Sequence, residues 1–294
     1  MCVLKRRTFM SSKHIARAVF GVLFFIGFIA VSILRNSTAV MGDDYGKPDE
    51  PKVEQVESVE QPEELPEELL ISEPTPEPTP EPTVDPNSPE GRALALGLPK
   101  PPEIDINSWE YILVNGENLL DASYQPPEIV NVSSSQCPVD SRIAQALMDM
   151  AADTEAQGLS VYLSSGYRSY SEQAANFVRV CQNNGVSDGK DAQGYYITMP
   201  AGGSEHQTGL CCDITDRYYQ IKNASLENTE MFQYMSANCE KFGFILRFPK
   251  DKGDITSVMY EPFHFRYVGV EAATYIKENN LCLEEFVALY KGEV

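Results

Sequence analysis

Two histidines and two carboxylates in this sequence have the types and spacing of a metal-dependent catalytic site. The chain has three histidines, and one lies in its basic leader, so the folded part contains only His206 and His264. Asp213 follows the first of these by seven residues, and Glu261 precedes the second by three. Together they could supply three ligands to a zinc ion, an open coordination position for water, and a separate carboxylate base. Either histidine alone would more simply be an ordinary surface or core residue.

The interval between His206 and Asp213 requires the chain to bend. In a continuous helix the two residues would lie about 10 Å apart along the axis, too far for metal–ligand bonds of about 2 Å. In a flat strand an offset of seven would point them to opposite faces. The segment 207–209, which ends in glycine, can supply the bend. We therefore expect residues 210–214 to form a short buried strand that delivers the carboxylate.

The cysteines allow more than one interpretation. Cys2 lies in the leader, and the other six form an even set compatible with disulfides, whose pairing the sequence leaves open: Cys137, Cys181, Cys211, Cys212, Cys239 and Cys282. Cys211 and Cys212 adjoin Asp213 and could be metal ligands. Neighbouring strand residues face opposite sides, however, and no C-x-x-C spacing exists. We interpret both as small buried packing residues.

The elements that must position these residues mix helices and strands without a regular alternation. The clearest helix is amphipathic and covers 140–156. Further elements follow from the apolar patterns: helices at 171–180 and 270–278, strands at 109–114, 159–163, 242–248, 258–260 and 265–268. The segment 183–203, rich in glycine and asparagine, is typical of a long loop that borders a site. The sequence predicts an α+β fold, a small mainly antiparallel sheet flanked by helices, in one domain over 93–294.

Charge divides the chain before that domain begins. Residues 1–40 contain six basic residues and no acidic ones, whereas residues 41–90 contain sixteen acidic residues against two lysines. The second segment therefore carries −14 of the net charge of −20. Outside the leader there is no basic stripe with interleaved aromatic residues, which argues against a nucleic-acid partner.

An apolar segment lies between these two charged regions. Residues 18–34 contain no charge and are just long enough to span a bilayer as a helix. Because the basic residues 1–17 precede it and the acidic residues follow it, we expect the N-terminus in the cytoplasm and the rest of the chain outside. The alternative is a cleaved signal peptide with a small-residue site at 37–39. The length of the apolar run favours an uncleaved membrane anchor.

Residues 35–92 have the composition of a disordered linker. Acidic residues and prolines dominate, and aromatic residues are almost absent, so this segment cannot build a core. Its repeat at 73–83, EPTPEPTPEPT, favours an extended polyproline II spacer of about 3.1 Å per residue. A proline-rich ligand for another domain is the alternative. We expect a stalk that holds the domain away from the membrane.

Several motifs, taken in order, resemble those of the VanY-type carboxypeptidases, a group of zinc peptidases that act on D-alanyl ends of peptidoglycan stems. The motifs are SGYRSY with EQ at 165–173, SEHQTGLxxD at 204–213, GFILRFPK at 243–250 and EPFHFRYVG at 261–269. The resemblance extends over about 109–290. The resemblance is specific because several motifs match and they occur in the same order as in the family.

Residue by residue, the resemblance implies a complete catalytic set. The implied zinc ligands are His206, Asp213 and His264; the general base is Glu261; the cation that polarises the scissile carbonyl is Arg168; and the substrate-orienting residues are Ser204 and Gln173. Four positions depart from the family pattern. Phe263 replaces a usual tryptophan, Cys211 and Cys212 replace small or aliphatic residues, and Gly203 replaces a usually larger residue. None of these removes a ligand or the base.

The resemblance therefore implies a monomeric, membrane-anchored zinc carboxypeptidase whose catalytic domain faces the cell wall outside the cell. Its partner would be the peptidoglycan stem peptide, and we expect D,D-cleavage that releases the terminal D-alanine. L,D-cleavage of tetrapeptide stems is an alternative within the same family. A non-catalytic module that binds or senses the wall is a second alternative, from a different class of function.

Overall fold

The computed structural model describes residues 84–292. The predicted leader, the apolar segment 18–34 and almost all of the predicted linker lie outside these residues. Within the described part, no helix combines the length and the apolar character needed to cross a membrane. The described residues fall within one compact unit.

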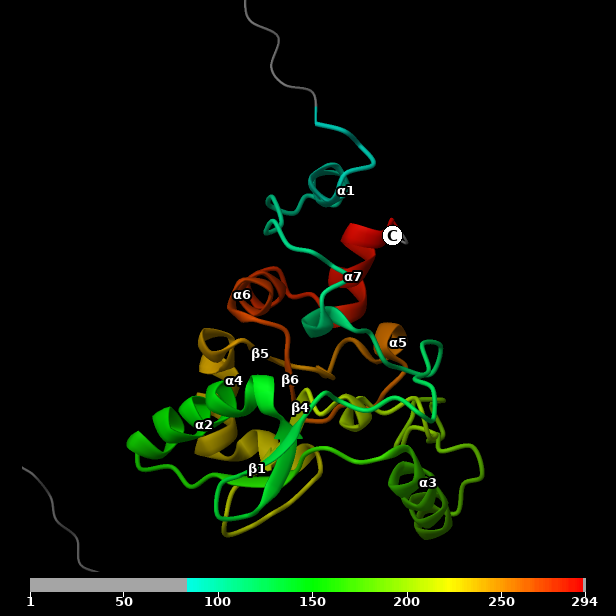
Figure 1. The fold of residues 1–294 in the computed structure, drawn as a ribbon, viewed down its shortest axis with the longest axis vertical. Coiled ribbons are helices and arrows are strands. Elements are labelled where there is room, and N and C mark those ends of the chain that lie inside the picture. Colours follow the sequence, from blue (N-terminus) through cyan, green and yellow to red (C-terminus); the bar gives the residue numbers. More distant parts are fainter. Residues whose placement is uncertain (1–83, 293–294) are drawn as a thin grey trace, which may run out of the picture. The chain divides into compact units, whose positions relative to one another are not determined.

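A four-stranded antiparallel sheet lies at the centre of this unit, with strand order β3-β4-β6-β5. Strands β4, β5 and β6 are labelled in Figure 1. The strands are β3 (Tyr162–Ser165), β4 (Cys211–Thr215), β5 (Phe244–Leu246) and β6 (His264–Tyr267). A separate antiparallel hairpin pairs β1 (Ile129–Val132) with β2 (Cys137–Asp140). The predicted α+β fold with small antiparallel sheets is confirmed.

Seven helices accompany these strands in the described residues: α1 (Pro89–Ala95), α2 (Ser141–Ala156), α3 (Tyr170–Asn184), α4 (Glu230–Asn238), α5 (Gly253–Thr256), α6 (Val270–Glu278) and α7 (Leu283–Lys291). Helix α2 begins where the Asp140 side chain accepts a hydrogen bond from the backbone of Arg142. Helix α3 begins with a capping box between Ser169 and Glu172 and ends at Gly185, whose φ of 67° is left-handed.

Two apolar clusters hold the elements together. The larger lies between α2, α4 and the sheet, and includes Leu147 and Phe265, both almost completely buried. The smaller gathers around α6 and α7 and includes Phe286. Helix α7 also packs against α1 and α5 (Figure 1). The two ends of the described chain thus meet where α1 packs on α7.

The sequence-based assignment is wrong at two of the expected strands. Residues 109–114 contain a short 3-10 helix, Trp109–Tyr111, and no strand. The position of Trp109 is set by aromatic stacking, because its ring lies on that of Tyr267 with 5.9 Å between centroids. The guanidinium of Arg142 covers the ring at 4.0 Å. Residues 258–260 contain only an isolated bridge at Val258. The sequence analysis did not assign the hairpin, α4 or α7.

Candidate active site

The central pair of strands places the predicted acid and the second predicted histidine side by side. On the antiparallel ladder between β4 and β6, Asp213 is the direct partner of His264. Directly opposite residues project their side chains to the same face of a sheet. Because β4 and β6 are the two inner strands, both residues are buried, with exposed fractions of 5 % and 3 %.

The first histidine reaches the same face through the expected bend. His206 lies in a 3-10 helix, Glu205–Thr208, that ends at Gly209 with a left-handed φ of 68°. A side chain at Gly209 would meet the backbone nitrogen of Asp140 at 2.9 Å from its Cβ, so both conformation and space favour glycine. Strand β4 starts two residues later. The predicted bend between His206 and Asp213 is therefore confirmed.

These three side chains converge on a single oxygen atom. Oδ1 of Asp213 lies 3.3 Å from Nε2 of His206 and 3.1 Å from Nδ1 of His264. The two imidazole rings are nearly perpendicular, at 87°, with centroids 5.1 Å apart. Ligand atoms about 2.0–2.1 Å from one tetrahedral ion would be separated by roughly 3.3 Å. Two neutral nitrogens and one carboxylate therefore fit a zinc ion in both spacing and donor type.

The remaining nitrogen of each ring has its own partner. Nδ1 of His206 lies 2.6 Å from the carbonyl oxygen of Gly166, and Nε2 of His264 lies 3.3 Å from Oε2 of Glu205. Such contacts fix which nitrogen carries the proton and hold the ring in orientation. Nε2 of His206 and Nδ1 of His264 are left facing Asp213, free to bind a metal.

Glu205 belongs to a buried ionic network that the sequence analysis missed. Its Oε1 accepts hydrogen bonds from Arg247 at 2.7 Å and Arg266 at 2.8 Å, and both arginines are completely buried. Arg247 also binds Glu284 of α7 through two hydrogen bonds of 2.6 and 2.8 Å. Burial alone would raise the pKa of Glu205, but the two guanidiniums hold it well below its usual range. The two guanidiniums therefore favour the charged form of the carboxylate beside His264.

Glu261 lies at the entrance to β6, next to the converging ligands. Its Oε2 is 3.8 Å from Nδ1 of His264, and 18 % of its side chain is exposed. Burial raises the pKa of Glu261 to about 7, against the opposing effect of His264. A carboxyl group with a pKa near neutrality, beside a metal-binding set, has the properties of a general base.

The other predicted site residues line the same cavity of about 440 Å³ as the three converging side chains. Arg168 donates a hydrogen bond of 2.7 Å to Oε1 of Gln173, and its backbone donates to the carbonyl of His206. Gln173 in turn donates to the carbonyl oxygen of Met199, in the loop that was expected to border the site. Ser204 lines the cavity and is 8 % exposed. The structure thus brings all seven residues together, and their individual roles stay predictions.

Two further cations on this cavity were not predicted. Lys222 donates to Oδ2 of Asp213 at 2.9 Å, and Arg179 extends from α3. With Arg168 they give the cavity three positive side chains, which suits a substrate that carries a carboxylate. Arg179 lies in the predicted helix 171–180. The sequence did not show that its side chain would line this cavity.

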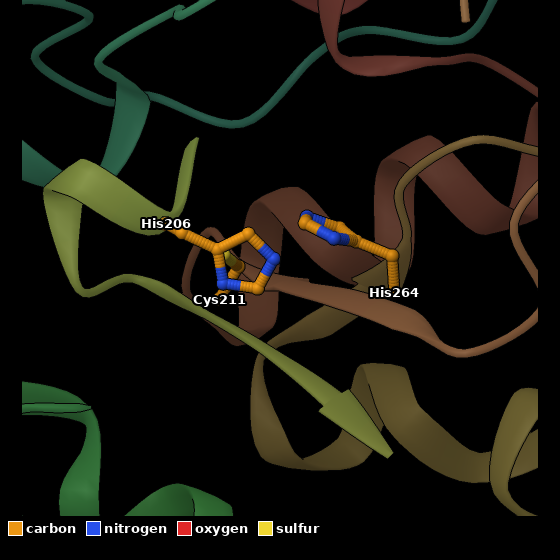
Figure 2. Close-up of side chains that lie close together, drawn as sticks. All are labelled: His206, Cys211 and His264. Atoms are coloured by element: carbon orange, nitrogen blue, oxygen red, sulfur yellow. The ribbon is translucent and has the colours of Figure 1, made fainter. Parts of the chain in front are cut away.

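The two cysteines of β4 behave differently. Sγ of Cys212 lies 3.7 Å from Sγ of Cys137 in the core, as expected for a packing residue. Cys211 instead joins His206 and His264 in a group whose ligand atoms all lie within 4.8 Å of one another (Figure 2). The six cysteines of the described residues are free thiols.

Comparison with known proteins gives consistent matches. The family model described as VanY, D-alanyl-D-alanine carboxypeptidase, matches residues 136–270. A D-alanyl-D-alanine carboxypeptidase of Enterococcus faecalis is 35 % identical over 212 residues, which are 68 % of this chain and 72 % of that protein.

Solved structures share both fold and sequence with this chain. The LD-carboxypeptidase LdcB is 32 % identical with a TM-score of 0.55, over 65 % of this chain and 94 % of that one. A mutant of the D,D-pentapeptidase VanY in complex with Zn(II) is 34 % identical with a TM-score of 0.51, over 61 % and 99 %. VanYB in complex with D-alanine-D-alanine is 35 % identical with a TM-score of 0.52, over 61 % and 98 %.

Proposed function

Because the chain belongs to the VanY family of D-alanyl-D-alanine carboxypeptidases, we propose that it is a zinc-dependent D,D-carboxypeptidase that releases the terminal D-alanine from peptidoglycan stem peptides. The observation that carries this proposal is the convergence of His206 and His264 on Oδ1 of Asp213. The relatives in complex with Zn(II) and with D-alanine-D-alanine support the metal and the substrate.

Three residues hold the metal in this proposal: His206 through Nε2, His264 through Nδ1 and Asp213 through Oδ1. Zinc bound there supplies a Lewis acid for the scissile carbonyl and for the attacking water. The contacts of Gly166 and Glu205 keep the two rings in the tautomers that this binding requires.

Glu261 acts as the base. It accepts the proton of the water that attacks the amide carbon, and it returns that proton to the departing amine of D-alanine. In the metal-free site burial raises the pKa of Glu261 to about 7, so this carboxyl group takes up a proton more readily than an exposed glutamate does.

Arg168 stabilises the negative charge that develops on the carbonyl oxygen. Its guanidinium is fixed by Gln173 at 2.7 Å, so little reorganisation is needed when the charge appears. The terminal carboxylate of the substrate enters a cavity that also contains Ser204, Arg179 and Lys222. We assign the orientation of that carboxylate to Ser204, with the two cations as electrostatic support.

The L,D-carboxypeptidase alternative rests on the similarity to LdcB. Both activities release D-alanine and differ in the residue on the other side of the scissile bond. The family model and the E. faecalis relative, both described as D-alanyl-D-alanine carboxypeptidases, favour D,D-cleavage.

We further propose that the enzyme is a monomer anchored by residues 18–34, with its catalytic domain outside the cell. The support comes from the sequence: an uncharged apolar segment with basic residues before it and acidic residues after it. The part of the predicted linker that precedes α1, which begins at Pro89, would then be the stalk that lets the active site reach the wall.

One assay tests the function. The purified full-length protein is incubated with pentapeptide and tetrapeptide stems, with and without a chelator, and released D-alanine is followed by mass. We expect chelator-sensitive release from the pentapeptide. Preferential release from the tetrapeptide would establish the L,D alternative. Binding of stems without release from either would show a non-catalytic wall-binding module instead.

A further inference from the structure

Cys211 occupies a position in the sheet that directs it to the metal-facing side. It lies two residues before Asp213 on β4, and residues two apart on a strand project to the same face. Cys212 projects to the opposite face, where its thiol meets Cys137. Cys211 is completely buried. The two neighbouring thiols therefore lie in different environments, one at the candidate metal centre and one in the apolar core.

The thiol of Cys211 completes a second set of metal-ligand side chains that shares both histidines with the first. In this set, the ligand atoms of His206, Cys211 and His264 lie within 4.8 Å of one another (Figure 2). In the other set, Oδ1 of Asp213 takes the place of the sulfur. Strand β4 thus supplies two candidate ligands beside the two histidines, Oδ1 of Asp213 and the sulfur of Cys211.

We propose that Cys211 is a fourth protein ligand of the metal centre, bound through its thiolate sulfur. This inference rests on the proposed function, because it requires a metal on His206 and His264. Zinc binds thiolates at about 2.3 Å and imidazole nitrogens at about 2.0–2.1 Å, so the group of His206, Cys211 and His264, whose ligand atoms lie within 4.8 Å of one another, would contract around the ion. The sulfur–metal bond forms as the S–H bond breaks, and the proton leaves to solvent.

A sulfur ligand changes what the centre can do. Four protein ligands are typical of closed structural zinc sites, whereas catalytic sites keep one position open. Water or substrate must therefore enter as a fifth ligand or in exchange for the sulfur of Cys211. The thiolate would hold the metal more tightly and restrain turnover.

The test uses the full-length protein loaded with Co(II) in place of zinc. A cobalt–thiolate bond gives a charge-transfer absorption band in the near ultraviolet, which nitrogen and oxygen ligands do not give. We expect this band in the wild type and in Cys212→Ala, and its loss in Cys211→Ala. Cys211→Ser, which keeps nearly the same volume, should lose the band as well and covers the case in which the alanine variant fails to fold.

Zinc affinity gives a second, independent measurement. In competition with a chelator, Cys211→Ala should bind zinc at least about tenfold more weakly than the wild type, while Cys212→Ala stays close to it.

The outcomes separate the two proposals. A wild-type protein that binds Co(II) and releases D-alanine but lacks the near-ultraviolet band overturns the role of Cys211 and leaves the proposed function intact. A band that persists in Cys211→Ala and Cys211→Ser also overturns it. A protein that binds neither zinc nor Co(II) overturns both.

Discussion

Glu205 and His264 are joined by a contact of 3.3 Å between Oε2 and Nε2, and this contact connects the candidate metal centre to a completely buried ionic network. The other oxygen of this carboxylate, Oε1, accepts hydrogen bonds from Arg247 and Arg266. A charged carboxylate on Nε2 keeps the proton there and leaves Nδ1 free to face the metal. Glu205 is therefore a positioning residue for His264, and it acts through that ring.

Replacement of this carboxylate separates its positioning role from its structural one. Glu205→Gln should weaken zinc binding about 10- to 100-fold, because the amide is a poorer partner for the Nε2 proton. It should also lower the free energy of unfolding by about 3–5 kcal/mol, since two buried guanidiniums lose their shared anion. Chelator competition and chemical denaturation measure the two effects.

The matched control is Glu284→Gln. Glu284 binds the same Arg247 but does not contact the histidine. This variant should lose stability and keep the zinc affinity of the wild type to within a few fold. If both variants weaken zinc binding equally, the effect comes from general destabilisation and Glu205 has no positioning role.

Removal of the proposed base should stop the chemistry without emptying the site. Glu261→Gln should lower kcat by at least about 100-fold while the protein keeps one zinc per chain, because Glu261 accepts a proton in the reaction and does not hold the metal. The checks are kinetics of D-alanine release and metal analysis of the same preparation. Loss of zinc from this variant would instead make Glu261 a ligand.

Arg168 should contribute to the rate more than to binding. Arg168→Ala should lower kcat by about 100- to 1,000-fold with a smaller change in KM, since its charge is most useful when the oxyanion forms. Arg217→Ala is a suitable control, because Arg217 pairs with Glu155 at 2.8 Å, away from this cavity. A main effect on KM would assign Arg168 to ground-state binding of the substrate carboxylate.

Zinc binding should release protons at neutral pH. Burial alone would lower the pKa of His206. The neighbouring Cys211 and Asp213 have a larger, opposite effect and raise this pKa to about 9 in the metal-free site. A histidine with this raised pKa is protonated at pH 7 and must lose its proton to bind metal, so zinc affinity should rise with pH until about pH 9. Calorimetry in buffers of different ionisation enthalpy should give at least one proton released per zinc. A count of zero would mean that the free site is already deprotonated.

The parts of the site that could be predicted from the sequence are those set by local backbone geometry. The seven-residue interval from His206 to Asp213 is incompatible with either regular element, and Gly209 supplies the turn that the structure contains. The same alternation puts Cys211 on the face of Asp213, but Cys211 was interpreted as a packing residue, because its position beside the histidines depends on the register between β4 and β6. That register is not visible in a single sequence.

The parts that could not be predicted depend on contacts between distant segments. Glu205 meets Arg266 across 61 residues of chain, and no local pattern links an acid in one motif to a base in another. Trp109 was misassigned for a related reason. The aromatic and aliphatic residues next to Trp109 in the sequence favour a strand. In the structure its ring packs between Arg142 and Tyr267, which belong to other elements.

The hydrogen bonds between Arg247 and Glu284 also set an order of assembly. Glu284 follows every other residue of the site in the sequence, so during synthesis from the N-terminus the buried arginine lacks one of its two anions until α7 has formed. Until then Arg247 is neutralised by Glu205 alone. Completion of α7 would thus be the step that secures the buried charges of the domain, and a chain that lacks α7 would be less stable.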